Sequence, residues 1–459
     1  FTTTEIFVED INSLLPKNYQ GLETQWGLAS MEIIRLSDSG YPMVLISPAN
    51  TKDASDYPIG VFELSNSIMA IDWIGYNNYS TPHNTFAFDL NNDDLLDFFV
   101  PGSSGHNPTG KHGEIPFLGI NRGTGFEDVS EIVFSEISST SDWAYGDFDG
   151  NGFEDILLLN VVYDEYNPLT NLYLNNGDES FTSRRDLLPS SIAGDDAMSS
   201  EGPKKVNFSY MAMDTGDMDN DGDLDIVVAE SVTGRWDAEI GFYSKKIPPQ
   251  IWENDGKGKF RISDSVIPLK SASEGSIQPV NLKLWDITGN GDLEIIYAAD
   301  DHKKNGIEDA YKTSDLVIYS RLADGNYKNI TSDKIDTMAL EVNGYWPASI
   351  SIIDVNNDMH EDIVVTLSPW GGLNIKPSAI IYYNNGNGYF AADYVEVLND
   401  WAVSFQLFND GSDDVIDAFQ LSRGTTAEGN GSFLKITGVL NEVRSDRTGS
   451  AGDDLLVGF

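Results

Sequence analysis

The residues with the clearest chemical potential are side-chain oxygens that recur at fixed spacing in five acidic stretches. Counting the first acidic residue of each stretch as position 1, the oxygens fall at positions 1, 3, 5 and 9, and position 7 can add its backbone carbonyl. Alternate residues in a tight turn point inward together, and six or seven hard oxygens suit Ca²⁺, whereas zinc prefers His and Cys. The predicted ligand positions of these five calcium sites are Asp89, Asn91, Asp93, Leu95 and Asp97; Asp147, Asp149, Asn151, Phe153 and Asp155; Asp217, Asp219, Asp221, Asp223 and Asp225; Asp286, Thr288, Asn290, Asp292 and Glu294; and Asp354, Asn356, Asp358, His360 and Asp362.

Two other interpretations of these stretches compete with a calcium loop of this type. An EF-hand needs a bidentate Glu at position 12 and flanking helices, but position 12 is apolar in all five stretches. An acidic turn without metal remains open. Two weaker copies begin at Arg35 and Asn409. The Arg35 copy has no carboxylate at a ligand position and is predicted to be empty, and occupancy of the Asn409 copy stays open.

The acidic stretches belong to a repeat that extends along most of the chain. Its seven copies begin near residues 35, 89, 147, 217, 286, 354 and 409, about 62 residues apart. A second phrase follows, as in LYLNNGDESF from Leu172, and is typical of a β-hairpin. Each copy therefore predicts strand A, an acidic loop, an apolar strand B, a longer loop, strand C, a tight turn and strand D.

This pattern predicts an all-β fold, a seven-bladed β-propeller of four-stranded antiparallel blades with calcium loops between strands A and B. A β-solenoid is the alternative, although its coils rarely need so many residues. Residues 1–445 would form the propeller and residues 446–459 a tail. The last copy is short of one strand, which TEIFVED near Thr4 could supply.

The loop D-x-[DN]-x-[DN]-G-x-x-D, followed by the LYLNNG-type turn, resembles the FG-GAP/VCBS repeat family, which includes the integrin α-subunit propeller and several propeller lectins. The resemblance implies calcium in the five loops but fixes no ligand, because members bind proteins or sugars and some are enzymes. The C-terminal GSAGDDLLVGF resembles the start of an RTX calcium-binding repeat. That second resemblance implies a monomeric module of a larger bacterial chain, extracellular or at the cell surface after type I secretion.

Composition narrows the possible partners. The formal net charge of −45 disfavours nucleic acid and anionic lipid. With no cysteine, the chain can form no disulfide and no thiolate site. No apolar run approaches the roughly 20 residues that span a bilayer, so we expect no membrane insertion.

Ligand-binding residues are predicted on the face opposite the calcium loops. The B–C and D–A segments are long, are predicted to be irregular, and hold much of the scarce basic charge together with several aromatic residues. Trp and Tyr stack on sugars or anchor proteins, and Lys and Arg bind carboxylate or sulfate. A purely solubilising role for these Lys residues remains open. The candidates are Lys111, Arg235, Trp236, Tyr243, Lys303, Trp346 and Trp370.

The leading functional hypothesis is a calcium-stabilised, lectin-like module of a bacterial adhesin that binds a glycan. An integrin-like protein-binding module and a polysaccharide-active enzyme such as a lyase are the alternatives. Catalysis is the least supported of these, because the chain has no HExxH, G-x-S-x-G or P-loop motif, and we identify no catalytic residue. Ligand identity cannot be read from the sequence.

Overall fold

The fold is known from a computed structural model, which describes the strands and the segments that connect many of them. Side-chain surroundings are described only within residues 86–391, with gaps. Among the described residues, no helix has the length and apolar character needed to cross a membrane. The described residues are 7–10, 28–34, 43–48, 59–63, 69–74, 86–102, 115–123, 125–134, 136, 138, 140–160, 170–189, 207–237, 241–246, 248–268, 276–302, 314–335, 345–355, 358–369, 379–384, 386, 388–395, 401–408, 415–423 and 432–441.

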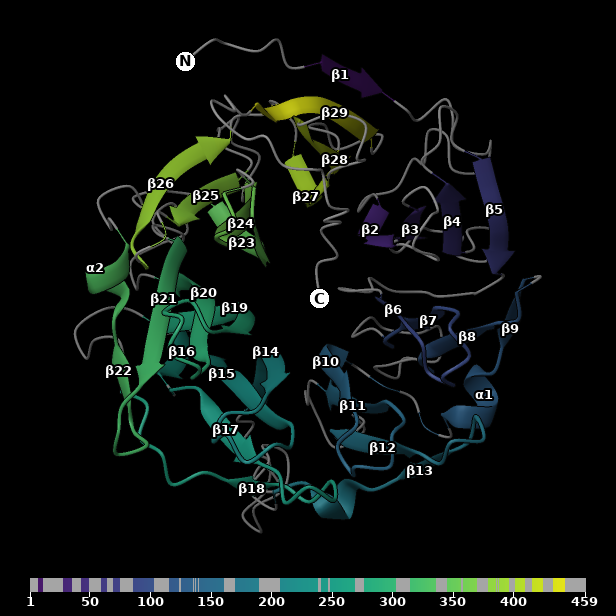
Figure 1. The fold of residues 1–459 in the computed structure, drawn as a ribbon, viewed down its shortest axis with the longest axis horizontal. Coiled ribbons are helices and arrows are strands. Elements are labelled where there is room, and N and C mark those ends of the chain that lie inside the picture. Colours follow the sequence, from purple (N-terminus) through teal and green to yellow (C-terminus); the bar gives the residue numbers. More distant parts are fainter. Residues whose placement is uncertain are drawn as a thin grey trace. The chain divides into compact units, whose positions relative to one another are not determined.

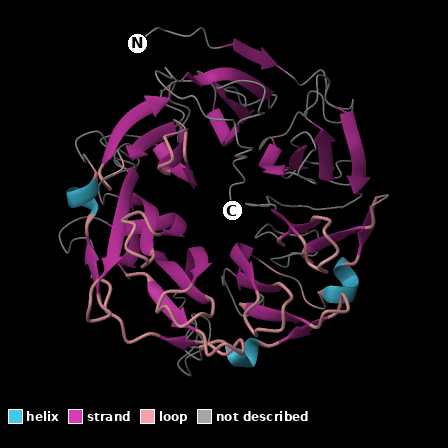
Figure 2. Ribbon diagram, in the orientation of Figure 1, coloured by secondary structure: helices cyan, strands magenta, loops and turns pink. Residues whose placement is uncertain are grey.

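The described strands form seven separate sheets, and the strand pairs whose register is described are antiparallel. The prediction of an all-β chain is confirmed (Figure 2), and six of the seven sheets have the predicted four antiparallel strands, whereas the sheet that begins with β14 has a fifth. The first four sheets in chain order contain β2 (Leu28–Ile34), β3 (Met43–Pro48), β4 (Ile59–Glu63) and β5 (Met69–Ile74); β6 (Phe86–Phe88), β7 (Asp97–Val100), β8 (Phe117–Asn121) and β9 (Phe126–Asp128); β10 (Thr140–Gly146), β11 (Asp155–Asn160), β12 (Asn171–Asn175) and β13 (Phe181–Ser183); and β14 (Asn207–Gly216), β15 (Asp225–Asp237), β16 (Gly241–Lys246), β17 (Gln250–Glu253) and β18 (Arg261–Ile262).

The remaining strands complete three more sheets, and the few helices are single turns. The sheets contain β19 (Ser276–Trp285), β20 (Glu294–His302), β21 (Ser314–Arg321) and β22 (Tyr327–Asn329); β23 (Tyr345–Ile353), β24 (Asp362–Pro369), β25 (Ala379–Asn384) and β26 (Phe390–Val395); and β27 (Trp401–Phe408), β28 (Val415–Arg423), β29 (Ser432–Asn441) and β1 (Phe7–Asp10). The helical turns are α1 (Ser130–Val133), η3 (Arg185–Leu187) and α2 (Thr331–Lys334) (Figure 1).

The N-terminal strand β1 completes the last sheet. It pairs antiparallel with β29, with Phe7 opposite Thr437 and Asp10 opposite Leu434. The chain's last three strands therefore gain their fourth strand from the N-terminus, as the shortage of strand material in the last repeat predicts. Two segments far apart in the sequence are thereby joined by backbone hydrogen bonds.

The chain divides into two compact units. One contains Phe1–Phe86, Ser351–Gly386 and Phe390–Phe459, and the other contains Ala87–Ile350 and Asn387–Tyr389. In the second unit, two B strands are buried along their whole length, as their continuous apolar runs predict: every residue of β7 and β11 is buried, and Ile156, Leu157 and Leu158 have no exposed surface. The core of this unit therefore lies along the B strands and the C strands that pair with them.

Side chains of the A strands join neighbouring sheets in the second unit. The Asp142 carboxylate of β10 accepts a 2.7 Å hydrogen bond from the Met213 N–H of β14, and Asp214 accepts one of 2.8 Å from the Leu284 N–H of β19. Burial raises the pKa of Asp142 to about 7. In the next sheet, Asn281 accepts the equivalent bond from the Ile350 N–H at 3.2 Å, so that a neutral amide can take the carboxylate's place.

One predicted connection is a regular structure instead. The segment from Glu230 was expected to be an irregular B–C loop, but β15 continues through it to Asp237 and pairs with β16, which places Trp236 opposite Phe242. That expectation was wrong because Val232, Thr233 and the three aromatic residues Trp236, Phe242 and Tyr243 favour extended backbone. Arg235 and Tyr243 therefore lie in strands of this hairpin, and Trp346 lies in β23. The other three ligand-face candidates, Lys111, Lys303 and Trp370, lie outside the described residues.

Candidate metal centres

All five strong acidic loops connect an A strand to a B strand, as predicted. They follow β6, β10, β14, β19 and β23, and each ends at the first residue of the next strand. That residue is the position-9 carboxylate, which is Glu294 in the loop from Asp286 and an Asp in the other four loops. The same order of strand, loop and strand therefore presents the predicted ligand positions each time.

The position-1 carboxylate organises each loop by the same two hydrogen bonds. In the loop from Asp147, Oδ1 accepts the Asn151 N–H at 2.9 Å and Oδ2 accepts the Gly152 N–H at 2.8 Å. The equivalent bonds to the N–H groups at positions 5 and 6 occur in the loops from Asp89, Asp217, Asp286 and Asp354. Each position-1 side chain therefore folds its loop into a turn before any ion is considered.

Left-handed backbone at position 6 makes this turn possible. The φ angles there are +90° at Gly152, +96° at Gly222 and +88° at Gly291. Glycine adopts this region without a steric penalty, which explains the sequence preference. Asp94 and Met359 adopt it as well, with φ of +64° and +69°. The five loops thus share one backbone shape although only three of them have the glycine.

The position-9 carboxylates are buried and attach each loop to strand C. Asp225 is 1% exposed, and it accepts hydrogen bonds of 2.9 Å from the Met218 N–H of its own loop and from the Asn254 N–H after β17. Asp97, Asp155 and Asp362 make the same pair of contacts. Glu294 instead accepts from the Thr288 N–H at 3.2 Å and the Ser320 hydroxyl at 2.7 Å.

Carboxylates converge most closely in two loops. The ligand atoms of Asp147, Asp149 and Asp155 lie within 4.8 Å of one another, and so do those of Asp217, Asp219 and Asp225. Burial first, and the neighbouring carboxylates next, raise the pKa of Asp155 and Asp225 to about 7. A cation held between these oxygens would relieve that repulsion, and the oxygen-only donor sets have the chemistry that Ca²⁺ requires.

The other predicted ligands are arranged less uniformly. Asn91, Asp149 and Asp219 at position 3 each accept the N–H of position 5, which turns their side chains into the loop. Thr288 directs its hydroxyl toward Glu294 at 3.3 Å. Asn356 lies outside the described residues. In all five loops, the position-5 side chain accepts a hydrogen bond from the backbone N–H of position 7. The pairs, acceptor first, are Asp93 and Leu95, Asn151 and Phe153, Asp221 and Asp223, Asn290 and Asp292, and Asp358 and His360.

The glycine of the C–D turn packs on the position-7 side chain. A Cβ atom at Gly177 would lie 2.5 Å from the Phe153 ring, and one at Gly386 would lie 2.4 Å from the His360 ring. Both glycines also have positive φ, of +77° and +76°. The recurring NNG phrase is therefore required by the acidic loop beneath it, which explains why the two phrases occur together.

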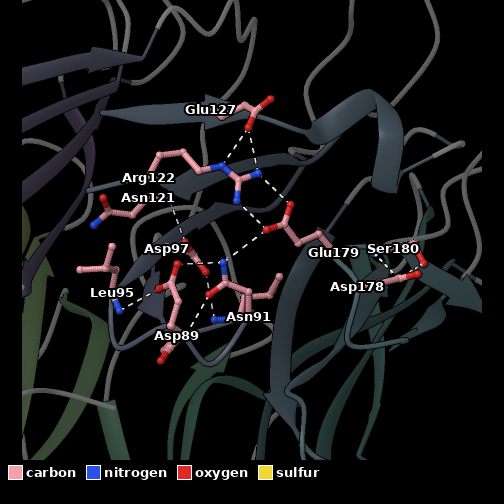
Figure 3. Close-up of polar contacts among 12 residues, drawn as sticks. Asp89, Asn91, Leu95, Asp97, Asn121, Arg122, Glu127, Asp178, Glu179 and Ser180 are labelled. Carbon is pink, nitrogen blue, oxygen red and sulfur yellow. Dashed lines mark hydrogen bonds and ion pairs between the residues drawn. The ribbon is translucent and has the colours of Figure 1, made fainter. Parts of the chain in front are cut away.

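Sequence reasoning missed the asparagines that link one loop to the next. The Asn175 Nδ2 donates to the Leu90 carbonyl at 2.9 Å, and the Asn254 Nδ2 donates to the Phe148 carbonyl at 2.8 Å. Both carbonyls belong to position 2 of the preceding acidic loop. Recurrence of Asn at the end of strand C was the available signal. Arg122 and Glu179, which lie close to the Asp89 loop in Figure 3, were also missed.

A family model for the FG-GAP-like repeat matches residues 217–297. This segment is similar to an FG-GAP-like repeat. It contains two complete acidic loops of the five, from Asp217 and from Asp286, together with the C–D turn between them. The predicted resemblance is confirmed over this part of the chain. No curated protein matches the sequence.

Three of the solved structures to which the chain is similar are the following. A polysaccharide lyase, Uly1, is 12% identical, with 89% of each chain covered and a TM-score of 0.44. An α-L-arabinanase from Penicillium chrysogenum is 10% identical over 77% of this chain and 92% of its own, with a TM-score of 0.40. The α-L-arabinofuranosidase Arb93A from Fusarium graminearum is 10% identical over 89% and 92%, with a TM-score of 0.41.

Proposed function

We propose that this chain is a seven-bladed β-propeller that binds about five Ca²⁺ ions in its FG-GAP-type loops and presents a ligand-binding face at the other end of its blades. Seven sheets of closely similar strand order support the blade count. Pairing of β1 with β29 supports closure of the last blade, because it fixes the N-terminus to the C-terminal repeat.

Repetition of one loop geometry is the main support for the calcium proposal. Five loops fold around their position-1 carboxylate in the same way, and two of them bring three carboxylates within 4.8 Å. Repulsion among such groups is costly unless protons or a cation compensate it. Ca²⁺ would supply that compensation at neutral pH and would hold each loop closed over strand C.

Metal analysis and melting curves test this proposal together. We expect about five calcium ions per chain after equilibrium dialysis, and a much lower melting temperature in excess EGTA. Ions that bind only the folded state stabilise it by about 2.7 kcal/mol per site at 100 times Kd. Two or fewer ions per chain, or a melting curve that EGTA leaves unchanged, would contradict a structural calcium role.

For the ligand, we propose a glycan bound at the end of the blades opposite the calcium loops. In the described part of the chain, the β15–β16 hairpin favours this placement. Strand β15 begins at the acidic loop with Asp225 and reaches Arg235 and Trp236 ten residues later, which corresponds to about 30 Å of extended strand. A basic and an aromatic residue therefore lie at strand positions far from the calcium end, and these are the residue types that bind and stack on an acidic sugar.

A glycan array probed with the calcium-loaded protein tests the ligand proposal. Binding to acidic glycans that is lost in Arg235→Ala/Trp236→Ala would support it. Binding to no glycan, with capture of a protein partner by the same face, would favour the integrin-like alternative. Release of unsaturated products from polyuronates, followed by absorbance near 232–235 nm, would instead indicate a lyase. We also propose an extracellular location in a bacterial adhesin, which detection of the protein outside the cell would test.

A further inference from the structure

One residue of a C–D turn adopts a backbone conformation that glycine adopts in equivalent turns. Glu179, four residues after the end of β12, has a φ of +63°. The residues at the same place in two other turns are Gly258, with a φ of +76°, and Gly388, with a φ of +71°. Glutamate is strained in this region, and such strain persists where the side chain has a use that outweighs it. The contacts of Glu179 show what that use is.

The Glu179 carboxylate bridges from its own sheet to the acidic loop of the preceding sheet. Its two oxygens accept hydrogen bonds from Arg122 Nη1 at 2.5 Å and Nη2 at 2.7 Å (Figure 3). The Arg122 Nε donates to Glu127 at 2.9 Å, so that the guanidinium is held on two sides. The Glu179 Oε1 also accepts a longer hydrogen bond, of 3.4 Å, from the Asn91 Nδ2.

Asn91 needs such a contact because it is an amide at a ligand position. A carboxylate presents oxygen in either orientation, as Asp149 and Asp219 do at the same position of the next two loops. An amide presents oxygen in one orientation only and an N–H₂ group, which repels a cation, in the other. The Asn91 Nδ2 donates to Asp93 and Glu179, while its Oδ1 accepts the Asp93 N–H at 3.2 Å. The nitrogen is thus shared between Asp93, at 3.1 Å, and Glu179, at 3.4 Å, and Glu179 is the acceptor outside the loop that fixes this amide orientation.

We propose that Glu179, held in place by Arg122, is a positioning residue that orients the Asn91 amide oxygen toward a calcium ion in the Asp89 loop. This inference rests on the proposed calcium function of that loop. If so, the loop from Asp89 depends on a residue of the next sheet for its full calcium affinity. Loops with Asp at position 3 do not depend on such a contact.

A simpler account is that Glu179 only adds negative charge near the ion. Glu127 offers a matched control, because both carboxylates bind Arg122 but, among these described residues, the hydrogen bond from Asn91 goes to Glu179 and not to Glu127. The variants are therefore Glu179→Gly, which restores the residue found in equivalent turns, and Glu127→Ala. Both remove one acidic partner of Arg122, and only the first removes the contact to the amide.

Chelator-competition titrations with calcium on the full chain provide the measurement. Asp89→Ala identifies the binding step that belongs to this loop, as the step it removes. Glu179→Gly should weaken that same step about tenfold, since loss of a contact that orients a metal ligand typically costs 10–100-fold in affinity. Glu127→Ala should leave the step nearly unchanged. In an Asn91→Asp background, Glu179→Gly should no longer weaken it, because a carboxylate needs no orientation.

Melting in EGTA gives a readout that does not depend on the ion. Glu179→Gly relieves strained backbone while losing an exposed ion pair, so its apo melting temperature should equal or exceed that of the wild type. A marked decrease there would assign Glu179 a structural role and overturn the inference.

The titrations separate failure of this inference from failure of the proposed function. Wild-type protein that binds no calcium would refute both. Normal wild-type binding, with no effect of Glu179→Gly or with an equal loss in Glu127→Ala, would refute the positioning role alone. An equal loss in the Asn91→Asp background would refute it as well, and so would an Asp89→Ala variant that loses no binding step.

Discussion

The loop from Asp217 allows the structural and the metal-binding roles of its carboxylates to be separated. Asp225 at position 9 accepts two backbone N–H groups and is almost fully buried, so it holds the loop to strand C whether or not calcium is present. Asp219 at position 3 accepts one N–H, from Asp221 at 3.2 Å, which an asparagine oxygen could accept equally well. We predict that Asp225→Asn destabilises the fold in EGTA and that Asp219→Asn does not.

The magnitude for Asp225→Asn follows from its two hydrogen bonds. An amide can accept only one of them, and its N–H₂ group then faces the second backbone N–H. Loss of one bond, with a buried donor left unpaired, costs about 3 kcal/mol. Because burial raises the pKa of Asp225 to about 7, the neutral amide also removes an unfavourable buried charge at neutral pH, and this value is therefore the upper bound of the net cost. With an unfolding entropy of about 2.1 cal/mol/K per residue, that corresponds to a decrease of about 3 °C for a chain of 459 residues.

For Asp219→Asn in EGTA, the expected change in melting temperature has the opposite sign or is zero. Burial, and then repulsion from Asp221, raise the pKa of Asp219, so the ionised side chain is unfavourable in the folded protein without an ion. Removing its charge should leave the apo melting temperature unchanged or slightly higher. In calcium the same variant should lose part of the stabilisation that the ion supplies to the wild type, because one ligand charge is missing.

Thermal melting of both variants, with calcium and with EGTA, measures these effects. Far-UV circular dichroism reports the sheets, and calcium titration reports the remaining number of sites. Equal destabilisation of the two variants in EGTA would show that position 9 has no special structural role. An Asp225→Asn variant as stable as wild type in EGTA would refute the hydrogen-bond argument directly.

Three other outcomes are expected. Burial raises the pKa of Asp142 in the folded protein to about 7, while its unfolded value stays near 3.8, so the stability of the wild type should fall as the pH rises from about 4 to 7. Asp142→Asn should reduce that fall in urea unfolding, and an unchanged pH profile would contradict this. Asn254→Ala should lower the free energy of unfolding by about 2–3 kcal/mol, since it removes the donor from the two carbonyls that Nδ2 contacts at 2.8 and 3.1 Å. As a control, Asp255→Ala, at an exposed residue of the same turn, should lower it by less than about 1 kcal/mol. Arg235→Ala with Trp236→Ala should remove glycan binding and leave the calcium stoichiometry unchanged, and retained binding would place the ligand elsewhere.

Much of the fold could be predicted because the strand order of each repeat is encoded by short motifs within that repeat. The acidic spacing places an A–B loop, the apolar run after it specifies a buried B strand, and NNG specifies the C–D turn. These signals need no knowledge of distant residues. The β15–β16 hairpin was missed because strand length in that region depends on pairing between two segments, and neither segment has a strong turn signal of its own.

The linking residues could not be predicted for a related reason. Asn175 and Asn254 contact carbonyls of the preceding loop, 85 and 106 residues earlier in the chain. Spacing within one repeat says nothing about contacts between repeats. The contact of Asn91 with Glu179 spans 88 residues, and only the structure brings these two side chains together. In the sequence, the one visible sign was a glutamate where other turns have glycine.

The hydrogen bonds of the loops indicate how calcium would act on them. Each position-1 carboxylate already accepts two backbone N–H groups, each position-9 Asp accepts two more, and Glu294 accepts one N–H and one hydroxyl, so each loop has its shape before an ion enters. An ion would then add little order to the backbone, and its binding free energy would not be spent on folding the loop. Its main effect would be to replace the protons that the buried position-9 carboxylates otherwise favour at neutral pH, since without an ion the pKa of Asp155, Asp225 and Asp362 lies at about 7. Calcium and protons should therefore compete for these loops, with calcium affinity falling as the pH drops below about 7.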